Sequence, residues 1–86
     1  MVVFLDEYKN SSDSKKIYLE SSFAYAIYDY LENNPQIKNK KLKEIAEEIF
    51  FIEKDGKARK FLEDLIKNKD KKFIQKINPY LLLYHN

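Results

Sequence analysis

Apolar residues recur along residues 40–68 at the three- and four-residue spacing of amphipathic helices. The first stripe contains Leu42, Ile45, Ala46, Ile49 and Phe50, and the second contains Ala58, Phe61, Leu62, Leu65 and Ile66. Asp55-Gly56 separates the stripes, because glycine accepts a left-handed conformation and aspartate can cap the following helix. The pattern predicts one helix from Asn39 and another from Lys57, with Ile45 and Leu62 facing each other.

An earlier helix is predicted to begin at Ser21 or Ser22, since a serine oxygen can accept a hydrogen bond from a free amide of the first turn. Its apolar face consists of Phe23, Ile27, Tyr30 and Leu31. Proline disfavours a helical conformation in the residue before it, so Asn34-Pro35 ends this helix at about Asn33.

The two ends of the chain read as strands. Residues 2–8 and 16–20 flank a cluster of turn-forming residues and could pair as a hairpin. Alternation in residues 16–20 places Ile17 and Leu19 on one face and Tyr18 on the other. Residues 73–77 and 80–84 flank Asn78-Pro79 and predict a second hairpin, although residues 70–77 also fit a short helix. The expected fold is α+β.

Length and composition predict one ordered domain over residues 1–86, with strands or an arm in 1–20 and the main core in 21–86. A chain of 86 residues buries only about 60% of its unfolded surface, so the large apolar residues should share one core. Hydrophobic residues make up 44% of the chain, which suits an ordered protein. Cysteine is absent, so neither disulfides nor thiolate-bound metal can stabilise the fold.

The sequence lacks the usual groups for catalysis or metal binding. His85 is the only histidine and is penultimate, where a frayed, exposed side chain is expected. A single glycine cannot form a phosphate-cradling loop, and no acidic segment has calcium-ligand spacing. We therefore expect no catalytic residues, metal or cofactor. The acidic start of the chain and the short apolar runs predict neither a signal peptide nor a membrane span, and thus an intracellular protein.

Positive charge gathers in three runs although the net charge is only +2. Lysines and one arginine cluster in residues 38–43, 54–60 and 67–76, around the predicted helix pair. Such runs are commonly solvated surface, but three of them beside one helical hairpin favour an acidic ligand.

The predicted order over residues 22–84 is helix, helix, turn, helix, strand, turn, strand, with Ile45-Ala46 in the helix before the turn. This order resembles the winged helix-turn-helix family of DNA-binding proteins. The resemblance implies a small transcriptional regulator of double-stranded DNA, in which residues 57–67 read the major groove and residues 71–84 form the wing. The implied DNA-binding residues are Lys40, Lys41, Lys57, Arg59, Lys60, Lys67, Lys71, Lys72 and Lys76.

Within residues 57–67 the charges are uneven. Lys57, Arg59 and Lys60 lie in the first turns, where the helix dipole also favours phosphate, whereas Glu63 and Asp64 would repel it. Phosphate contacts are therefore expected at the amino end of this helix.

The chain is rich in aromatic residues, with seven tyrosines and six phenylalanines. Tyrosine is enriched at protein interfaces, and these rings exceed what one small core easily accommodates. We expect a homodimer or protein partner at Tyr25, Tyr28, Tyr80, Leu82 and Tyr84. The alternative function is thus a protein-interaction module, such as an inhibitor of a host complex. Abundant lysine, asparagine, isoleucine and tyrosine are compatible with an AT-rich viral or archaeal genome.

Overall fold

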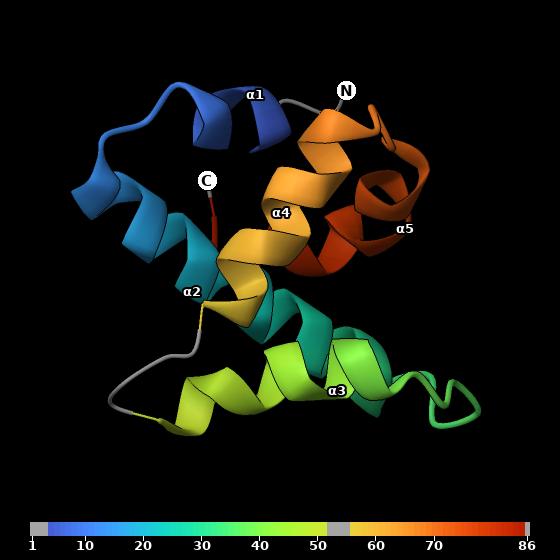
Figure 1. Ribbon diagram of the computed structural model, residues 1–86. Coiled ribbons are helices and arrows are strands. Elements are labelled where there is room, and N and C mark those ends of the chain that lie inside the picture. The colour runs from blue at the N-terminus through green and yellow to red at the C-terminus, as the bar shows by residue number, and fades with distance from the viewer. Residues whose placement is uncertain (1–3, 52–55, 86) are drawn as a thin grey trace.

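The computed structural model describes residues 4–51 and 56–85, and these fold as a helical bundle (Figure 1). The elements are α1 (Phe4–Lys9), α2 (Asp13–Glu32), α3 (Lys40–Glu47), the 3-10 helix η1 (Glu48–Phe50), α4 (Lys57–Lys67) and α5 (Lys72–Leu81). The longest helix, α2, contacts each of the other elements, and α3 and α4 cross the same side of it in Figure 1. The core therefore lies between α2 and the other helices.

The helix pair from Asn39 and Lys57 is confirmed. The Asn39 side chain caps α3 by accepting a hydrogen bond from the Leu42 amide at 3.1 Å. Gly56 precedes α4 with a φ of 76°, the left-handed conformation expected of it. Ile45 and Leu62 are both buried, as the two stripes predict. Phe50 is an exception, because its side chain is 68% exposed. The predicted cap, Asp55, lies outside the described residues.

The predicted strand at residues 2–8 is wrong for the part that the structure describes. Phe4, Leu5 and Tyr8 are buried at helical spacing in α1. All three pack into the common core, which a six-residue helix needs because short isolated helices are unstable in water.

The strand at residues 16–20 and the caps at Ser21 and Ser22 are also wrong, because α2 begins at Asp13. Ser12 is the N-cap, and its hydroxyl accepts a hydrogen bond from the Lys15 amide at 3.4 Å. Ile17 is exposed whereas Leu19 is buried, so these residues do not share a face. The cluster of turn-forming residues that suggested a hairpin thus starts a helix. Its end at Asn33, before Pro35, is as predicted.

The C-terminal hairpin is replaced by α5, so the helical alternative for residues 70–77 is correct. Ile74, Ile77 and Leu81 form the buried face of α5. Pro79 is accommodated in the last turn of the helix, where the lost amide hydrogen bond and the kink affect few residues.

No strand occurs in residues 4–51 or 56–85. The α+β class is therefore wrong, and the protein is all-α over the described residues. Residues 71–84, expected to form a wing, are α5 and the turns after it. The β-hairpin wing expected over these residues is accordingly also wrong.

Candidate interaction surfaces

The amino end of α4 is occupied by a carboxylate of the protein itself. Glu48 is only 3% exposed, and its two oxygens accept hydrogen bonds from the amides of Lys57 and Ala58, each at 3.3 Å. This contact supplies the negative charge that a helix N-terminus favours. A phosphate placed there, as the sequence suggested, would have to displace a buried carboxylate.

Arg59, in the first turn of α4, is committed to another internal contact. Its Nε donates a hydrogen bond to Glu20 Oε2 at 2.6 Å, and the Tyr8 hydroxyl donates to the same oxygen at 2.5 Å. This Tyr8–Glu20–Arg59 network joins α1, α2 and α4. Burial and the Glu20 carboxylate raise the pKa of Tyr8, and the hydrogen bond to Glu20 raises the pKa of Arg59. The network supports the fold rather than presenting a free cation.

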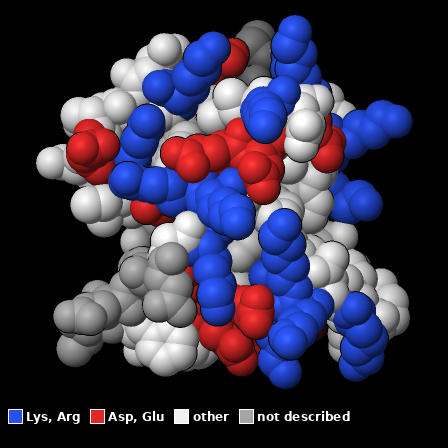
Figure 2. All heavy atoms as spheres, viewed as in Figure 1, with Lys and Arg blue, Asp and Glu red and all other residues white. Residues whose placement is uncertain are grey.

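The structure does not gather the predicted DNA-binding residues into one site. Lys57 lies 4.0 Å from Glu44, and the Lys41 amine lies 5.6 Å from the Phe61 ring centroid. Lys40 and Lys60 are exposed on α3 and α4. Figure 2 shows basic and acidic side chains interleaved over this face. Lys67, Lys71, Lys72 and Lys76 lie within ten residues of one another along the chain, around the turn that joins α4 to α5.

We call this last group, with Lys69, the α4–α5 corner. All five lysines are exposed, and none forms an ion pair within residues 4–51 and 56–85. The chain turns here by a Schellman motif, in which the Asp70 amide bonds to the Leu65 carbonyl and the Lys69 amide bonds to the Ile66 carbonyl. Lys69 has a φ of 52°, although the left-handed position of this motif favours glycine.

A second surface, the aromatic face, lies on the solvent side of α2 and consists of Tyr18, Ser21, Tyr25, Tyr28, Phe50 and Tyr84. The Tyr25 and Tyr84 rings are stacked with centroids 5.2 Å apart, and Tyr28 meets Phe50 edge-on at 6.0 Å. Tyr18 and Tyr25 are 54% and 42% exposed. The rings therefore form two pairs that keep part of their surface open to solvent.

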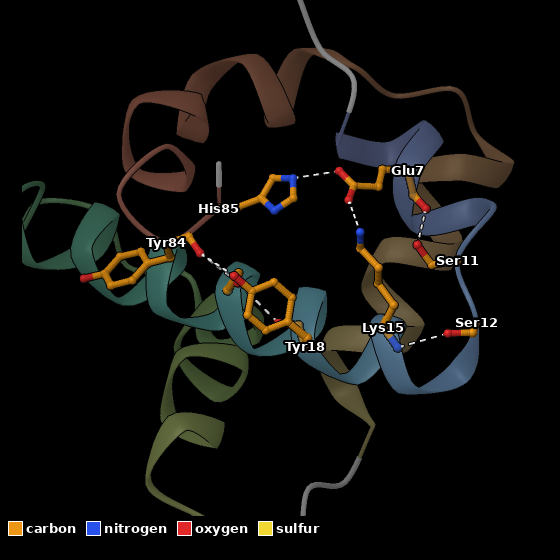
Figure 3. A network of polar contacts seen from close by, with 8 residues as sticks. Glu7, Ser11, Ser12, Lys15, Tyr18, Tyr84 and His85 are labelled. Atoms are coloured by element: carbon orange, nitrogen blue, oxygen red, sulfur yellow. Dashed lines mark hydrogen bonds and ion pairs between the residues drawn. The ribbon is translucent and has the colours of Figure 1, made fainter.

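Tyr84 is held firmly on this face. Its hydroxyl donates a hydrogen bond to Asp29 at 2.5 Å, and its carbonyl accepts from Tyr18 at 3.4 Å and from Ser22 at 3.2 Å. In Figure 3, Tyr18 and Tyr84 both lie in front of α2. The hydrogen bond to Asp29 and burial raise the pKa of Tyr84.

The predicted interface residues are only partly brought together. Tyr25, Tyr28 and Tyr84 lie on the aromatic face, whereas Tyr80 packs edge-on against Tyr30 at 5.8 Å and Leu82 is exposed after α5. The predicted interface omitted Tyr18 and Phe50. The alternating three- and four-residue spacing of positions 18, 21, 25 and 28 is the signal that would have identified Tyr18.

A groove of about 640 Å³ extends the aromatic face between α2 and α3. Its apolar lining includes Tyr28, Leu31, Pro35, Ile37, Ala46 and Phe50. Lys38, Lys40 and Lys43 border it together with Glu32 and Glu47, so its rim carries both signs of charge.

The C-terminal segment is anchored rather than frayed, which corrects the expectation for His85. Its Nε2 lies 2.8 Å from Glu7 Oε1 (Figure 3). Its ring meets Phe4 edge-on at 5.4 Å. Glu7 also pairs with Lys15 at 3.0 Å, and this hydrogen bond, with a smaller contribution from His85, lowers the pKa of Glu7. Glu7 thus joins the C-terminal segment to α1 and α2.

Among the described residues, no group of three or more histidine, cysteine, aspartate or glutamate side chains could hold a metal ion. Within the same residues, no helix is both long and apolar enough to cross a membrane. No protein-family model, curated protein sequence or solved structure matches the chain.

Proposed function

We propose that the protein binds double-stranded DNA by contacting backbone phosphates with the α4–α5 corner. The observation that carries the proposal is the density of unpaired positive charge: residues 67–76 contain five lysines and one aspartate. These lysines are exposed and lack ion pairs within the described residues, so they can meet phosphates without breaking an internal contact. Counterion release then supplies the binding free energy.

Lys69 is an independent argument for this corner. A left-handed conformation costs a residue with a Cβ roughly 1–2 kcal/mol, and glycine avoids most of that cost. The lysine at this position supports a use for its charge, since strained positions concentrate at functional sites.

The proposed mode of binding is independent of base sequence. Arg59 and the amides at the start of α4 are already bonded to Glu20 and Glu48, so α4 offers few free groups to read bases from its amino end. Lysines that contact phosphates position a protein on the duplex but carry no sequence information themselves. We therefore propose a general DNA-binding role in regulation, with lysines of the corner as the ligands.

The proposal predicts that Lys71→Glu/Lys72→Glu weakens binding to a random duplex and flattens its salt dependence. Each lost phosphate contact removes about 0.9 from the slope of log affinity against log salt, so the double variant should lose about 1.8. Fluorescence anisotropy between about 50 and 200 mM salt measures the affinity and its salt slope, because affinity that depends on phosphate contacts falls steeply over this range. Lys9→Glu/Lys38→Glu is the matched control, since both lysines are exposed and distant in sequence from the corner. Equal losses in both variants, or no wild-type binding at the lower salt, would refute the proposal.

Lys69→Gly separates the charge of the corner from its conformation. We expect this variant to raise the free energy of unfolding by about 1 kcal/mol, because glycine tolerates the left-handed φ. At the same time it should lower the salt slope of DNA binding by about 0.9. Urea unfolding and anisotropy measure the two effects. A more stable variant with unchanged DNA binding would remove Lys69 from the proposed site.

The aromatic face favours a second function, namely protein interaction. Contiguous exposed apolar surface is uncommon on a monomeric protein and marks a binding site more often than scattered apolar residues do. This face is distinct from the α4–α5 corner, so both functions can coexist in one protein.

A further inference from the structure

We infer that the aromatic face binds a second copy of this chain, with α2 packed antiparallel against the partner's α2 about a two-fold axis. The inference is independent of DNA binding, because it uses α2, η1 and the C-terminal segment rather than the α4–α5 corner.

Charge favours a second copy over a charged partner. Between Lys16 and Asp29 the only charged residue of α2 is Glu20, which is buried and bonded to Arg59. The centre of the aromatic face is therefore uncharged, in a protein of which 35% of residues are charged. Two copies with a net charge of +2 can meet there without placing like charges in contact. A strongly charged partner would find no complementary groups at that centre.

The spacing of the face fits helix pairing. Positions 14, 18, 21, 25, 28 and 32 follow one another at intervals of four and three residues, which is the seam of a coiled coil. From Tyr18 to Tyr28 this seam extends about 15 Å along the helix, at a rise of about 1.5 Å per residue. The length is enough for a contact between two helices over their middle turns.

The seam is also symmetric about position 23, as a two-fold interface requires. In an antiparallel pair, Tyr18 lies opposite the partner's Tyr28, and Ser21 lies opposite the partner's Tyr25. A small residue thus faces a large one at the centre, so the rings can interdigitate. At the ends of the seam, Ser14 lies opposite the partner's Glu32.

Polar groups and rigidity support the same arrangement. The hydroxyls of Ser21, Tyr25 and Tyr28 have no hydrogen-bond partner within the described residues, and across the two-fold axis they can bond to one another. Tyr84 already stacks on Tyr25 and holds the Tyr18 hydroxyl. Because these rings are ordered before association, little side-chain entropy is lost on binding.

Sedimentation equilibrium without DNA tests the dimer and its interface. The wild type should show twice the 10.4 kDa monomer mass at about 100 μM and dissociate on dilution. Tyr25→Glu should weaken dimerisation at least tenfold, because it places a charge opposite Ser21 on both sides of the axis. Ser21→Glu, which removes no ring contact, should do the same, while circular dichroism verifies that both variants remain folded.

Gln75→Glu is the matched control, because it adds the same charge at an exposed position of α5 and should leave dimerisation unchanged. A monomeric wild type at 100 μM would overturn the inference. Dimers of unchanged affinity in folded Ser21→Glu would overturn it as well, since the interface would then lie elsewhere.

The antiparallel direction has its own test. Ser14→Lys should tighten the dimer by about two- to tenfold, since each lysine would approach the partner's Glu32 at the edge of the seam. Adding Glu32→Gln should abolish that gain. A parallel pair would instead bring the two lysines together, so weaker association of Ser14→Lys would overturn the antiparallel arrangement.

Discussion

Leu62→Ala should lower the free energy of unfolding by about 2–5 kcal/mol, the range for truncating a fully buried leucine. Leu62 is 0% exposed and lies in the middle of α4, which packs against α1, α2 and α3. The lost methyl groups remove apolar burial, and the surrounding helices can fill the cavity only partly. Urea unfolding at one fixed protein concentration measures the change, because dimerisation would make stability depend on concentration.

Leu83→Ala is the matched control for Leu62→Ala. It removes the same atoms from a side chain that is 69% exposed, so its effect should stay within about 0.5 kcal/mol. Similar unfolding curves for the two variants would contradict the position of Leu62 in the core.

The sequence predicted the middle of the fold better than its ends. The stripes around Ile45 and Leu62 extend over two or more turns, and Asn39 and Gly56 provide separate boundary signals. Only a helix satisfies all of these constraints. The segments predicted as strands at residues 2–8 and 73–77 are at most seven residues long, and over that length the spacings of strand and helix cannot be distinguished. Packing against α2 decides in favour of helix in both segments.

For the candidate sites, local sequence likewise did not predict which charged side chains are bonded within the protein. Lysine runs predict exposure correctly, but the free or bonded state of a cation depends on residues far away in sequence. Arg59 is bonded to Glu20, 39 residues earlier, and Glu48 reaches amides nine and ten residues later. Neither contact has a local sequence signal. The seam of the aromatic face was present in the sequence, but assigning residues 16–20 to a strand separated Tyr18 from Tyr25.

Arg59→Met should lower the free energy of unfolding by about 2–3 kcal/mol, because it leaves the Glu20 carboxylate in a poorly solvated site with one donor fewer. The Glu20 side chain is 11% exposed and that of Arg59 is 37% exposed, so the loss should be smaller than for a fully buried pair. Methionine preserves most of the packing of the arginine stem. Lys60→Met is the control, since Lys60 is an exposed neighbour on α4 and its loss should cost less than about 0.5 kcal/mol.

A double-mutant cycle separates the charge of Glu20 from the packing of Arg59. Glu20→Gln retains an acceptor for the Tyr8 hydroxyl but removes the charge that Arg59 balances. Combining it with Arg59→Met should therefore cost less than the sum of the two single losses, because no unpaired carboxylate remains. Strictly additive losses would show that Arg59 and Glu20 do not interact in solution.

Tyr8 makes the stability of this network depend on alkaline pH. Burial and the Glu20 carboxylate raise the pKa of Tyr8 in the folded protein, whereas an unfolded tyrosine titrates near its ordinary value of about 10. A raised folded pKa means that the folded state retains a proton that the unfolded state releases. The contribution of Tyr8 to the free energy of unfolding is therefore fully present below about pH 10, and it is lost as the pH rises from there toward the folded pKa.

Tyr8→Phe tests this dependence. At neutral pH the variant should be less stable by about 1–3 kcal/mol, because Glu20 loses a hydrogen-bond donor in a buried site. Above pH 10 the difference from the wild type should shrink, since phenylalanine has no proton to lose, and unfolding curves at pH 7 and pH 11 measure this convergence. Tyr84→Phe is a useful comparison, because the pKa of Tyr84 is also raised but its hydroxyl bonds to Asp29 near the surface. A constant difference between Tyr8→Phe and the wild type at both pH values would contradict the buried Tyr8–Glu20 hydrogen bond.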